Sequence, residues 1–169
     1  AAVARLHQLG VRTLLVTGDI QAAAEHVAAE VGIDEVVAGA RPADKLAVVD
    51  RLRAQGLRVG MIGDGVNDAP ALAAADVGFA VGSGTEVAME AAHLTIASGD
   101  IGRVAQTIAL SRRTMSVIHQ NLFWAFGYNA LAIPVAASGR LNPMFASAAM
   151  AMSSVSVVSN SLRLNRGAL

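Results

Sequence analysis

The sequence predicts an α/β fold with a parallel sheet over its first hundred residues, followed by a pair of long helices. Short apolar runs typical of strands alternate with helical patterns as far as residue 100, and this alternation is typical of helix-covered parallel sheets. A glycine-rich acidic segment, GDGVNDAP at 63–70, directly follows one of the apolar runs. All 13 acidic residues lie at or before Asp100, so the last part of the chain has a different character.

Local signals give the bounds of the elements in the first part. Apolar runs predict short strands at 12–17, 35–37, 57–62, 77–81 and 94–96. Charge spacing and alanine content predict helices at 21–31, 42–55, 67–74 and 85–92, and residues 1–9 resemble the end of another helix. Gly32 ends the helix at 21–31, whereas Pro42 and Gly56 mark the first turn and the end of the next one.

Two long uncharged stretches follow residue 100. A helix that carries arginines is expected at 101–116, and residues 114–139 and 141–162 contain no Asp, Glu, Lys or Arg. The 22 residues of the second stretch reach about 33 Å as a helix, which matches a bilayer core about 30 Å thick. We therefore expect an all-α transmembrane hairpin, connected at 138–143, with Asn142 as a helix N-cap and Pro143 in the first turn. A buried helical hairpin of a large soluble protein is the alternative.

The arginines orient the expected hairpin. Arg140 lies in the connection, whereas five arginines flank the outer ends of the pair: Arg103, Arg112, Arg113, Arg163 and Arg166. Because positive residues favour the cytoplasmic side, we expect a multi-pass protein of the cell membrane, with residues 1–100 and the C-terminus in the cytoplasm. The expected parts are a cytoplasmic domain at 1–100, a linker helix and first span at 101–139, and a second span with a tail at 140–169.

Composition excludes several classes of partner and site. The arginines of the last part are sparse and lie among apolar residues, which argues against an arm that binds nucleic acid. The chain has no Cys, so it forms no disulfide and no thiolate metal site of its own. Residue 1 is Ala and no signal peptide opens the chain, so we expect a piece of a longer protein.

Asp64 and Asp68 are the first candidates for a functional site. They lie in a glycine-rich turn after the strand predicted at 57–62, and ligand sites of α/β sheets lie beyond the carboxyl ends of strands. Carboxylates and the neighbouring amide of Asn67 are hard oxygen ligands suited to Mg²⁺ and to a phosphate that it carries. The alternative is a solvated turn of Asp, Asn and Gly.

Two further segments fit the same chemistry. Thr17, Gly18 and Asp19 follow the first predicted strand, so we expect them at the same edge of the sheet as the 63–70 segment. The Thr17 hydroxyl can donate to a phosphate oxygen. Lys45, the only lysine of the chain, can neutralise a phosphoryl group as a point charge. The alternatives are a turn residue at the strand end for Thr17 and a solvated helix charge for Lys45.

Together these segments resemble the P-type ATPases. TGD at 17–19, PADK at 42–45 and GDGVNDAP at 63–70, followed by two spans, are similar to the phosphorylation domain and last membrane helices of that family. The resemblance covers essentially the whole chain and implies a haloacid-dehalogenase-like fold. It also implies a cycle in which MgATP phosphorylates the Asp of an Asp-Lys-Thr-Gly-Thr motif, after which the phosphate is hydrolysed.

The resemblance also implies roles for particular residues. Asp64 would ligate Mg²⁺, and Asn67 and Asp68 would complete that site. Thr17 and Lys45 would contact the phosphoryl group, and Gly18 and Asp19 would bind the cofactor together with them. Glu86 stands where the family usually has Asp, and either acid suits the start of a helix.

One departure from the family is large. The Asp-Lys-Thr-Gly-Thr segment is absent from the sequence, as are the nucleotide-binding domain, the actuator domain and the earlier spans. The resemblance therefore implies an incomplete sheet and no ATP hydrolysis by this chain alone. Its partners would be the missing N-terminal domains of the same polypeptide, the lipid bilayer and the transported metal ion. The alternatives are a membrane-tethered haloacid-dehalogenase-like phosphatase and a regulatory module that binds Mg²⁺ or phosphate.

Polar residues inside the expected spans predict an ion path. Tyr128 and Asn129 lie in mid-span, where polar groups are costly and usually functional. Met150 and Ser154 share a helix face at i and i+4, and a thioether is a soft ligand that favours monovalent copper. The alternatives are a helix–helix hydrogen bond from Asn129 and a packing role for Met150 and Ser154.

YN at 128–129 and MAMSS at 150–154 resemble the copper(I)-exporting subgroup of the family. This implies that Cu⁺, or the chemically similar Ag⁺, passes an exit path lined by Tyr128, Asn129, Met150 and Ser154. Zinc and cadmium exporters use an acidic residue and a Lys in these spans, and neither span has them.

Overall fold

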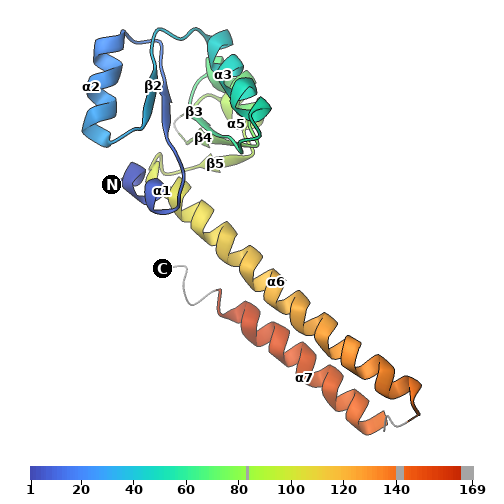
Figure 1. Ribbon diagram of the computed structural model, residues 1–169. Helices are drawn as coiled ribbons and strands as arrows, with labels where there is room; N and C mark the ends of the chain where they lie inside the picture. The colour runs from blue at the N-terminus through green and yellow to red at the C-terminus, as the bar shows by residue number, and fades with distance from the viewer. Residues whose placement is uncertain (83, 140–142, 165–169) are drawn as a thin grey trace. The chain divides into compact units, whose positions relative to one another are not determined.

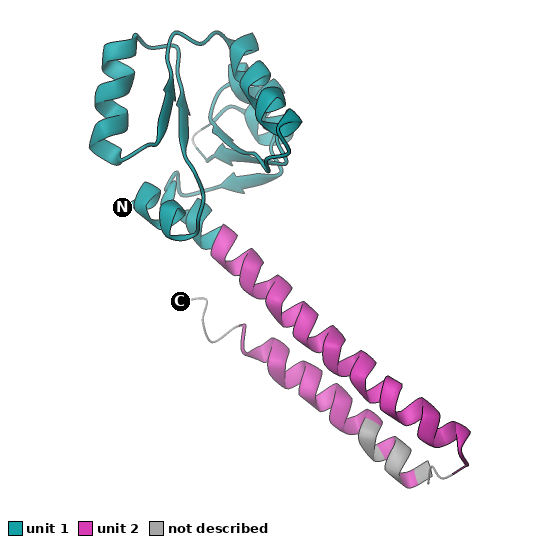
Figure 2. Cartoon of the chain, viewed as in Figure 1, with its two compact units in different colours: residues 1–107 teal, residues 108–169 magenta. Residues whose placement is uncertain are grey.

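The computed structural model describes residues 1–82, 84–139 and 143–164 (Figure 1). The chain divides into two units, Ala1–Thr107 and Ile108–Leu169 (Figure 2). The predictions made for Arg140, Asn142 and Arg166 concern residues outside the described part of the chain.

The first unit alternates helices and strands in the predicted order. Its helices are α1 (Ala2–Gln8), α2 (Gln21–Val31), α3 (Pro42–Ala54), the 3-10 helix η1 (Val66–Asp68), α4 (Ala69–Ala74) and α5 (Glu86–Ala91). Its strands are β1 (Leu14–Val16), β2 (Glu35–Val37), β3 (Gly60–Gly63), β4 (Val77–Val81) and β5 (Leu94–Ile96). The bounds predicted for α2, β2, β4 and β5 are confirmed.

Every strand pair in the described part of the chain is parallel, as predicted, but the strands form two sheets. One sheet pairs β1 with β2, so that Leu14 lies opposite Glu35, and the other has the order β3-β4-β5. Among the described residues, β1 and β3 each pair on one edge only. The segments 17–19 and 63–70 therefore follow strands of separate sheets. The sequence predicts that both lie at the same edge of one sheet, and this prediction differs from the structure.

Two strands begin later than predicted, and in each a carboxylate accepts from the backbone N–H of the residue just before the strand. The N–H of Thr13 donates to Asp34 Oδ2 at 2.7 Å, and β1 begins one residue later. The N–H of Val59 donates to Asp76 Oδ2 at 2.9 Å, and β3 begins at Gly60.

Helix ends and close packing explain several small residues. Gly32 and Gly56 follow α2 and α3 with φ of 81° and 78°, the left-handed conformation that glycine adopts most easily. Leu72 of α4 is fully buried. A Cβ on Gly78 of β4 would lie 2.5 Å from the carbonyl oxygen of Leu72, so only glycine fits at position 78. Helix α4 therefore lies against the β3-β4-β5 sheet, whose strand β3 leads into the 63–70 segment.

The second unit is built from two helices. Helix α6 (Gly102–Ala137) begins in the first unit and continues without a break past Pro134, and α7 (Pro143–Leu162) runs back beside it (Figure 2). Within the residues that the structure describes, no helix combines the length and the apolar character needed to cross a membrane. The predicted helical hairpin is present, and its membrane crossing stays a prediction.

Candidate functional site

The 63–70 segment forms a tight turn at the carboxyl end of β3. The N–H of Asp68 donates to the Gly65 carbonyl at 3.0 Å, which closes η1, and Pro70 lies in the first turn of α4. A Cβ on Gly63 would lie 2.6 Å from the Cβ of Asp68. Glycine at 63 therefore lets the Asp68 side chain fold back against the end of the strand.

Asp68 forms an ion pair with Lys45. Lys45 Nζ lies 2.7 Å from Asp68 Oδ1, and the two side chains are 21% and 9% exposed. The other carboxylate oxygen, Oδ2, accepts from the backbone N–H of Asp64 at 3.3 Å. Asp68 is the one buried charged residue in the described part of the chain. Both its oxygens have donors, as a buried carboxylate requires.

Asp64 and Asn67 expose their side chains on the same turn. The Asp64 backbone is held from both sides, because its carbonyl also accepts from the N–H of Thr85 at 2.8 Å. Gly84 permits this contact, since a Cβ there would lie 2.6 Å from the Asp64 carbonyl oxygen. Neither the Asp64 carboxylate nor the Asn67 amide has a hydrogen-bond partner among the described residues, so both are available to a ligand.

This donor set fits Mg²⁺ that arrives with a phosphate. Mg²⁺ in such sites takes one or two carboxylates and keeps waters or phosphate oxygens as its remaining ligands. Asp64 supplies a free carboxylate, and Asn67 an amide oxygen. No group of three His, Cys, Asp or Glu side chains that could enclose a metal occurs among the described residues. The arrangement suits an open site that is completed by a ligand.

Thr17 and Asp19 form a separate local turn after β1. Thr17 Oγ1 donates to Asp19 Oδ2 at 2.8 Å, and the Asp19 N–H donates to Thr17 Oγ1 at 3.2 Å. The Thr17 carbonyl accepts from the N–H of Ala40 at 2.9 Å, just before the helix that carries Lys45. Between this turn and the Lys45–Asp68–Asp64 cluster, no hydrogen bond occurs in the described part of the chain.

The residues predicted for the ion path lie on both helices of the second unit. The Asn129 amide donates to the Ala125 carbonyl of its own helix at 2.9 Å, and the Tyr128 ring lies 6.3 Å from that of Trp124. Met150 is 73% exposed and Ser154 is also exposed. No described hydrogen bond joins the pair on α6 to the pair on α7, and the Asn129 bond is not the helix–helix bond of the alternative interpretation.

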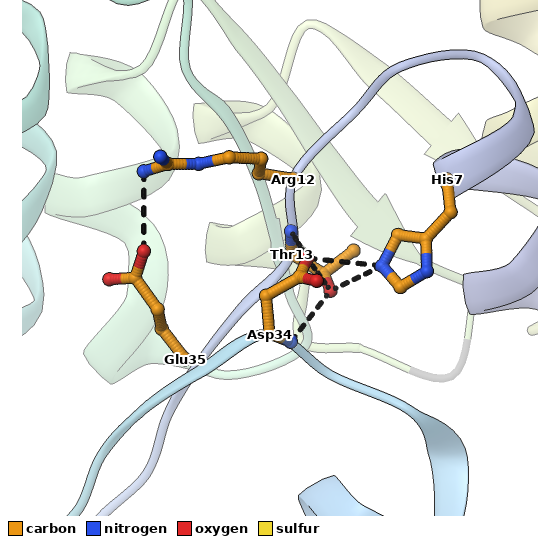
Figure 3. A network of polar contacts seen from close by, with 5 residues as sticks. All are labelled: His7, Arg12, Thr13, Asp34 and Glu35. Atoms are coloured by element: carbon orange, nitrogen blue, oxygen red, sulfur yellow. Dashed lines mark hydrogen bonds and ion pairs between the residues drawn. The ribbon is translucent and has the colours of Figure 1, made fainter.

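The structure contains a polar network that the sequence did not indicate (Figure 3). His7 Nε2 lies 3.0 Å from Asp34 Oδ2, and Thr13 donates to the same oxygen from its N–H and, at 2.9 Å, from its hydroxyl. The backbone N–H of Thr13 is the largest cause of a lowered Asp34 pKa. The three residues are separated by up to 27 positions, so no spacing pattern could have revealed them. The network joins α1 to the beginnings of β1 and β2.

Comparison with known families agrees with this architecture. Two family models described as haloacid dehalogenase-like hydrolase match residues 1–76 and 46–108. The first part of the chain therefore has the parallel fold of that class, as the sequence predicts.

Relatives identify the family within the class. The chain is 56% identical over 164 residues to a probable copper-exporting P-type ATPase V of Mycobacterium tuberculosis, and 53% identical over 165 residues to a copper-exporting P-type ATPase of Bacillus subtilis. These matches cover 97% and 98% of the chain and 21% of each relative. A solved zinc-transporting PIB-type ATPase in the E2.Pi state matches 96% of the chain and 27% of its own length, with a TM-score of 0.88 and 38% identity. The chain belongs to the P-type ATPases, as its motifs predict.

Proposed function

We propose that this chain forms the C-terminal part of an ATP-driven pump that exports copper(I) across the cell membrane through an aspartyl-phosphate cycle. The observation that carries the proposal is the Lys45–Asp68–Asp64 cluster at the end of β3. It combines a cation, a positioning carboxylate and a free carboxylate, the groups that phosphoryl transfer needs for charge neutralisation. The chain spans about a fifth of the length of its curated relatives, so the activity belongs to the longer protein.

Each residue of the cluster has a distinct role in this proposal. Asp64 and Asn67 hold Mg²⁺, which supplies positive charge beside the transferred phosphoryl group. Lys45 neutralises a phosphoryl oxygen, and the ion pair with Asp68 fixes where its ammonium lies. Asp68 also anchors the backbone of Asp64, and it acts mainly as a positioning residue. The Thr17 hydroxyl donates to a phosphate oxygen once it turns away from Asp19, and Gly18 and Asp19 line that side of the site.

The phosphorylated Asp has to come from outside these residues. The single-edge pairing of β1 and of β3 supports a further parallel strand between them, which would unite the two sheets. A strand that ends in Asp-Lys-Thr-Gly-Thr would bring its Asp to the edge where both turns lie. MgATP reaches that Asp through a nucleotide-binding domain of the same polypeptide, so the chain alone is inactive.

Copper(I) is the transported ion in this proposal, and α6 and α7 form a membrane hairpin. The relatives named above as copper-exporting are more than 50% identical to the chain, against 38% for the zinc-transporting structure. No acidic side chain follows Asp100, so residues 101–169 offer no carboxylate to a divalent ion. Met150, Ser154, Tyr128 and Asn129 offer a soft thioether and neutral oxygens, a set suited to Cu⁺ and also to Ag⁺.

The test is copper(I)-stimulated ATP hydrolysis by the full-length protein in detergent under reducing conditions. We expect wild-type hydrolysis to depend on Mg²⁺ and to rise with copper(I), and the Asp64→Asn variant to lose both. Glu90→Gln, which removes a carboxylate of α5 outside the cluster, serves as the matched control. Hydrolysis that is indifferent to copper(I), or an Asp64→Asn variant as active as the control, would refute the proposal.

A further inference from the structure

A solvent-open cavity of about 180 Å³ lies between α6 and α7 in the second unit, and both arginines that line it are exposed. It is lined by Arg113, Ser116, Val117 and Gln120 of α6 and by Asn160 and Arg163 at the end of α7. Its volume is roughly six times the ~30 Å³ that one water occupies in the liquid, so it has room for a small polyatomic ion. Five of the six lining residues carry polar side chains, which is unlike a packing defect between apolar helices.

The two arginines of this cavity have donors to spare. Arg113 donates from Nη2 to the Arg163 carbonyl at 2.8 Å, which caps the end of α7. A guanidinium has five N–H donors, so this bond leaves most of Arg113 unused. The Arg163 guanidinium has no partner among the described residues, and residues 101–169 contain no acidic side chain to neutralise either arginine.

The two amides beside the arginines differ, because Asn160 uses both N–H donors of its amide whereas Gln120 keeps its NH₂ group free. Asn160 Nδ2 donates to Gln120 Oε1 at 3.2 Å and to Asn121 Oδ1 at 2.9 Å. Because the Gln120 oxygen is engaged, its NH₂ group is the free end of that amide. The Ser116 hydroxyl adds a further donor. The cavity thus combines two positive charges that have no ion-pair partner among the described residues with neutral donors from Gln120 and Ser116, which is the chemistry that recognises a phosphate group.

We propose that this cavity, lined by Arg113, Gln120 and Arg163, is a binding site for a phosphate group, separate from the site at Asp64. The phosphate comes either from an anionic lipid headgroup or from free phosphate in solution. The lipid source rests on the proposed membrane hairpin, in which both arginines lie at the cytoplasmic ends of the helices, whereas binding of the phosphate group itself does not.

The test measures binding of two probes to the full-length protein in a neutral detergent: inorganic phosphate and the short-chain lipid dihexanoyl-phosphatidylglycerol. Dihexanoyl-phosphatidylcholine serves as the zwitterionic reference. We expect Arg163→Gln to weaken binding of at least one probe about tenfold, since a charge-assisted hydrogen bond is lost. Arg103→Gln removes one positive charge from the same part of the sequence but outside the cavity, and should leave binding unchanged.

The two probes distinguish a lipid headgroup from free phosphate as the ligand. A loss confined to phosphatidylglycerol identifies a lipid headgroup site, a loss confined to inorganic phosphate identifies a soluble anion, and a loss of both identifies a general phosphate site. Arg113→Gln, which also removes the cap of α7, should act in the same direction as Arg163→Gln. Equal binding by wild type and Arg163→Gln for both probes, or an equal loss in Arg103→Gln, overturns the proposal. Neither binding measurement uses copper or ATP hydrolysis. The phosphate-binding result therefore stands whether or not the proposed pump function is correct.

Discussion

Lys45 and Asp68 are 23 positions apart in the sequence, and their side chains meet at 2.7 Å. The pair joins the first turn of α3 to η1, and the second oxygen of Asp68 holds the backbone of Asp64. One contact thus links helix packing to the geometry of the candidate metal-binding turn. Changes to this pair should affect both stability and the site.

Removing the partner of Asp68 should destabilise the protein strongly. Lys45→Met leaves a carboxylate that is 9% exposed without its cation, and breaking a buried pair costs about 3 kcal/mol or more. Arg41→Met is the matched control, because its pair with Asp44 lies on the same turn of α3 with side chains 85% and 44% exposed. An exposed pair contributes less than about 1 kcal/mol.

Chemical unfolding of the full-length protein and of both variants checks this prediction. A Lys45→Met variant as stable as Arg41→Met would contradict it, and would mean that water or another donor satisfies Asp68. Asp68→Asn in the Lys45→Met background should restore part of the loss, because a neutral amide is less costly to bury than an unpaired charge.

A methyl group at Gly63 should disturb the turn. The Cβ of Gly63→Ala would lie 2.6 Å from the Asp68 Cβ and 2.9 Å from its Oδ2, so Asp68 has to move. We expect a loss of about 1–3 kcal/mol, the usual cost of overpacking, together with weaker Mg²⁺-dependent hydrolysis. Gly60→Ala is the control, since its Cβ would lie 3.8 Å from a ring carbon of Phe79, an ordinary contact. Thermal unfolding and Mg²⁺ titrations of activity distinguish the two variants, and equal behaviour would argue against a tight turn.

The sequence predicts the order of elements better than their pairing. Apolar runs and punctuating Gly and Pro residues place α2, β2, β4 and β5 correctly, because these signals are local. The Lys45–Asp68 contact and the His7–Thr13–Asp34 network join distant positions, and no local pattern specifies them. The contact between the N–H of Val59 and the Asp76 side chain, just before β3, is of the same kind. The separation of the strands into two sheets depends on which edges have partners, which spacing alone does not determine.

Acid should weaken the protein partly through Asp76. The hydrogen bond from Val59 N–H is the largest cause that lowers the pKa of Asp76 below its ordinary 3.8, and Arg53 and Arg58 act in the same direction. A lowered pKa stabilises the fold above pH 3.8, and this contribution is lost as the pH falls through the folded-state pKa. Asp76→Asn should therefore flatten the dependence of unfolding free energy on pH below about 4.

The pH series needs wild type, Asp76→Asn and the control Asp50→Asn, which removes an exposed carboxylate of α3. Some dependence should remain in Asp76→Asn, because the pKa values of Asp34 and Asp44 are lowered too. Equal slopes for Asp76→Asn and wild type would show that Asp76 does not contribute.

Substitution of two methionines of α7 should affect copper(I) binding differently. Met150 and Met152 are both exposed, at 73% and 64%, but two residues of a helix differ by about 200° in direction. Met150→Ala removes the thioether proposed for the ion path and should lower copper(I) affinity at least about tenfold, a loss that even outer-shell changes produce at metal sites. Met152→Ala removes the same chemistry from another face and should leave affinity unchanged.

Copper(I) titration of the full-length protein under reducing conditions provides the measurement, with Asn129→Ala expected to follow Met150→Ala. Equal losses in both methionine variants would point to general packing of α7, and no loss in either would move the copper path away from this helix.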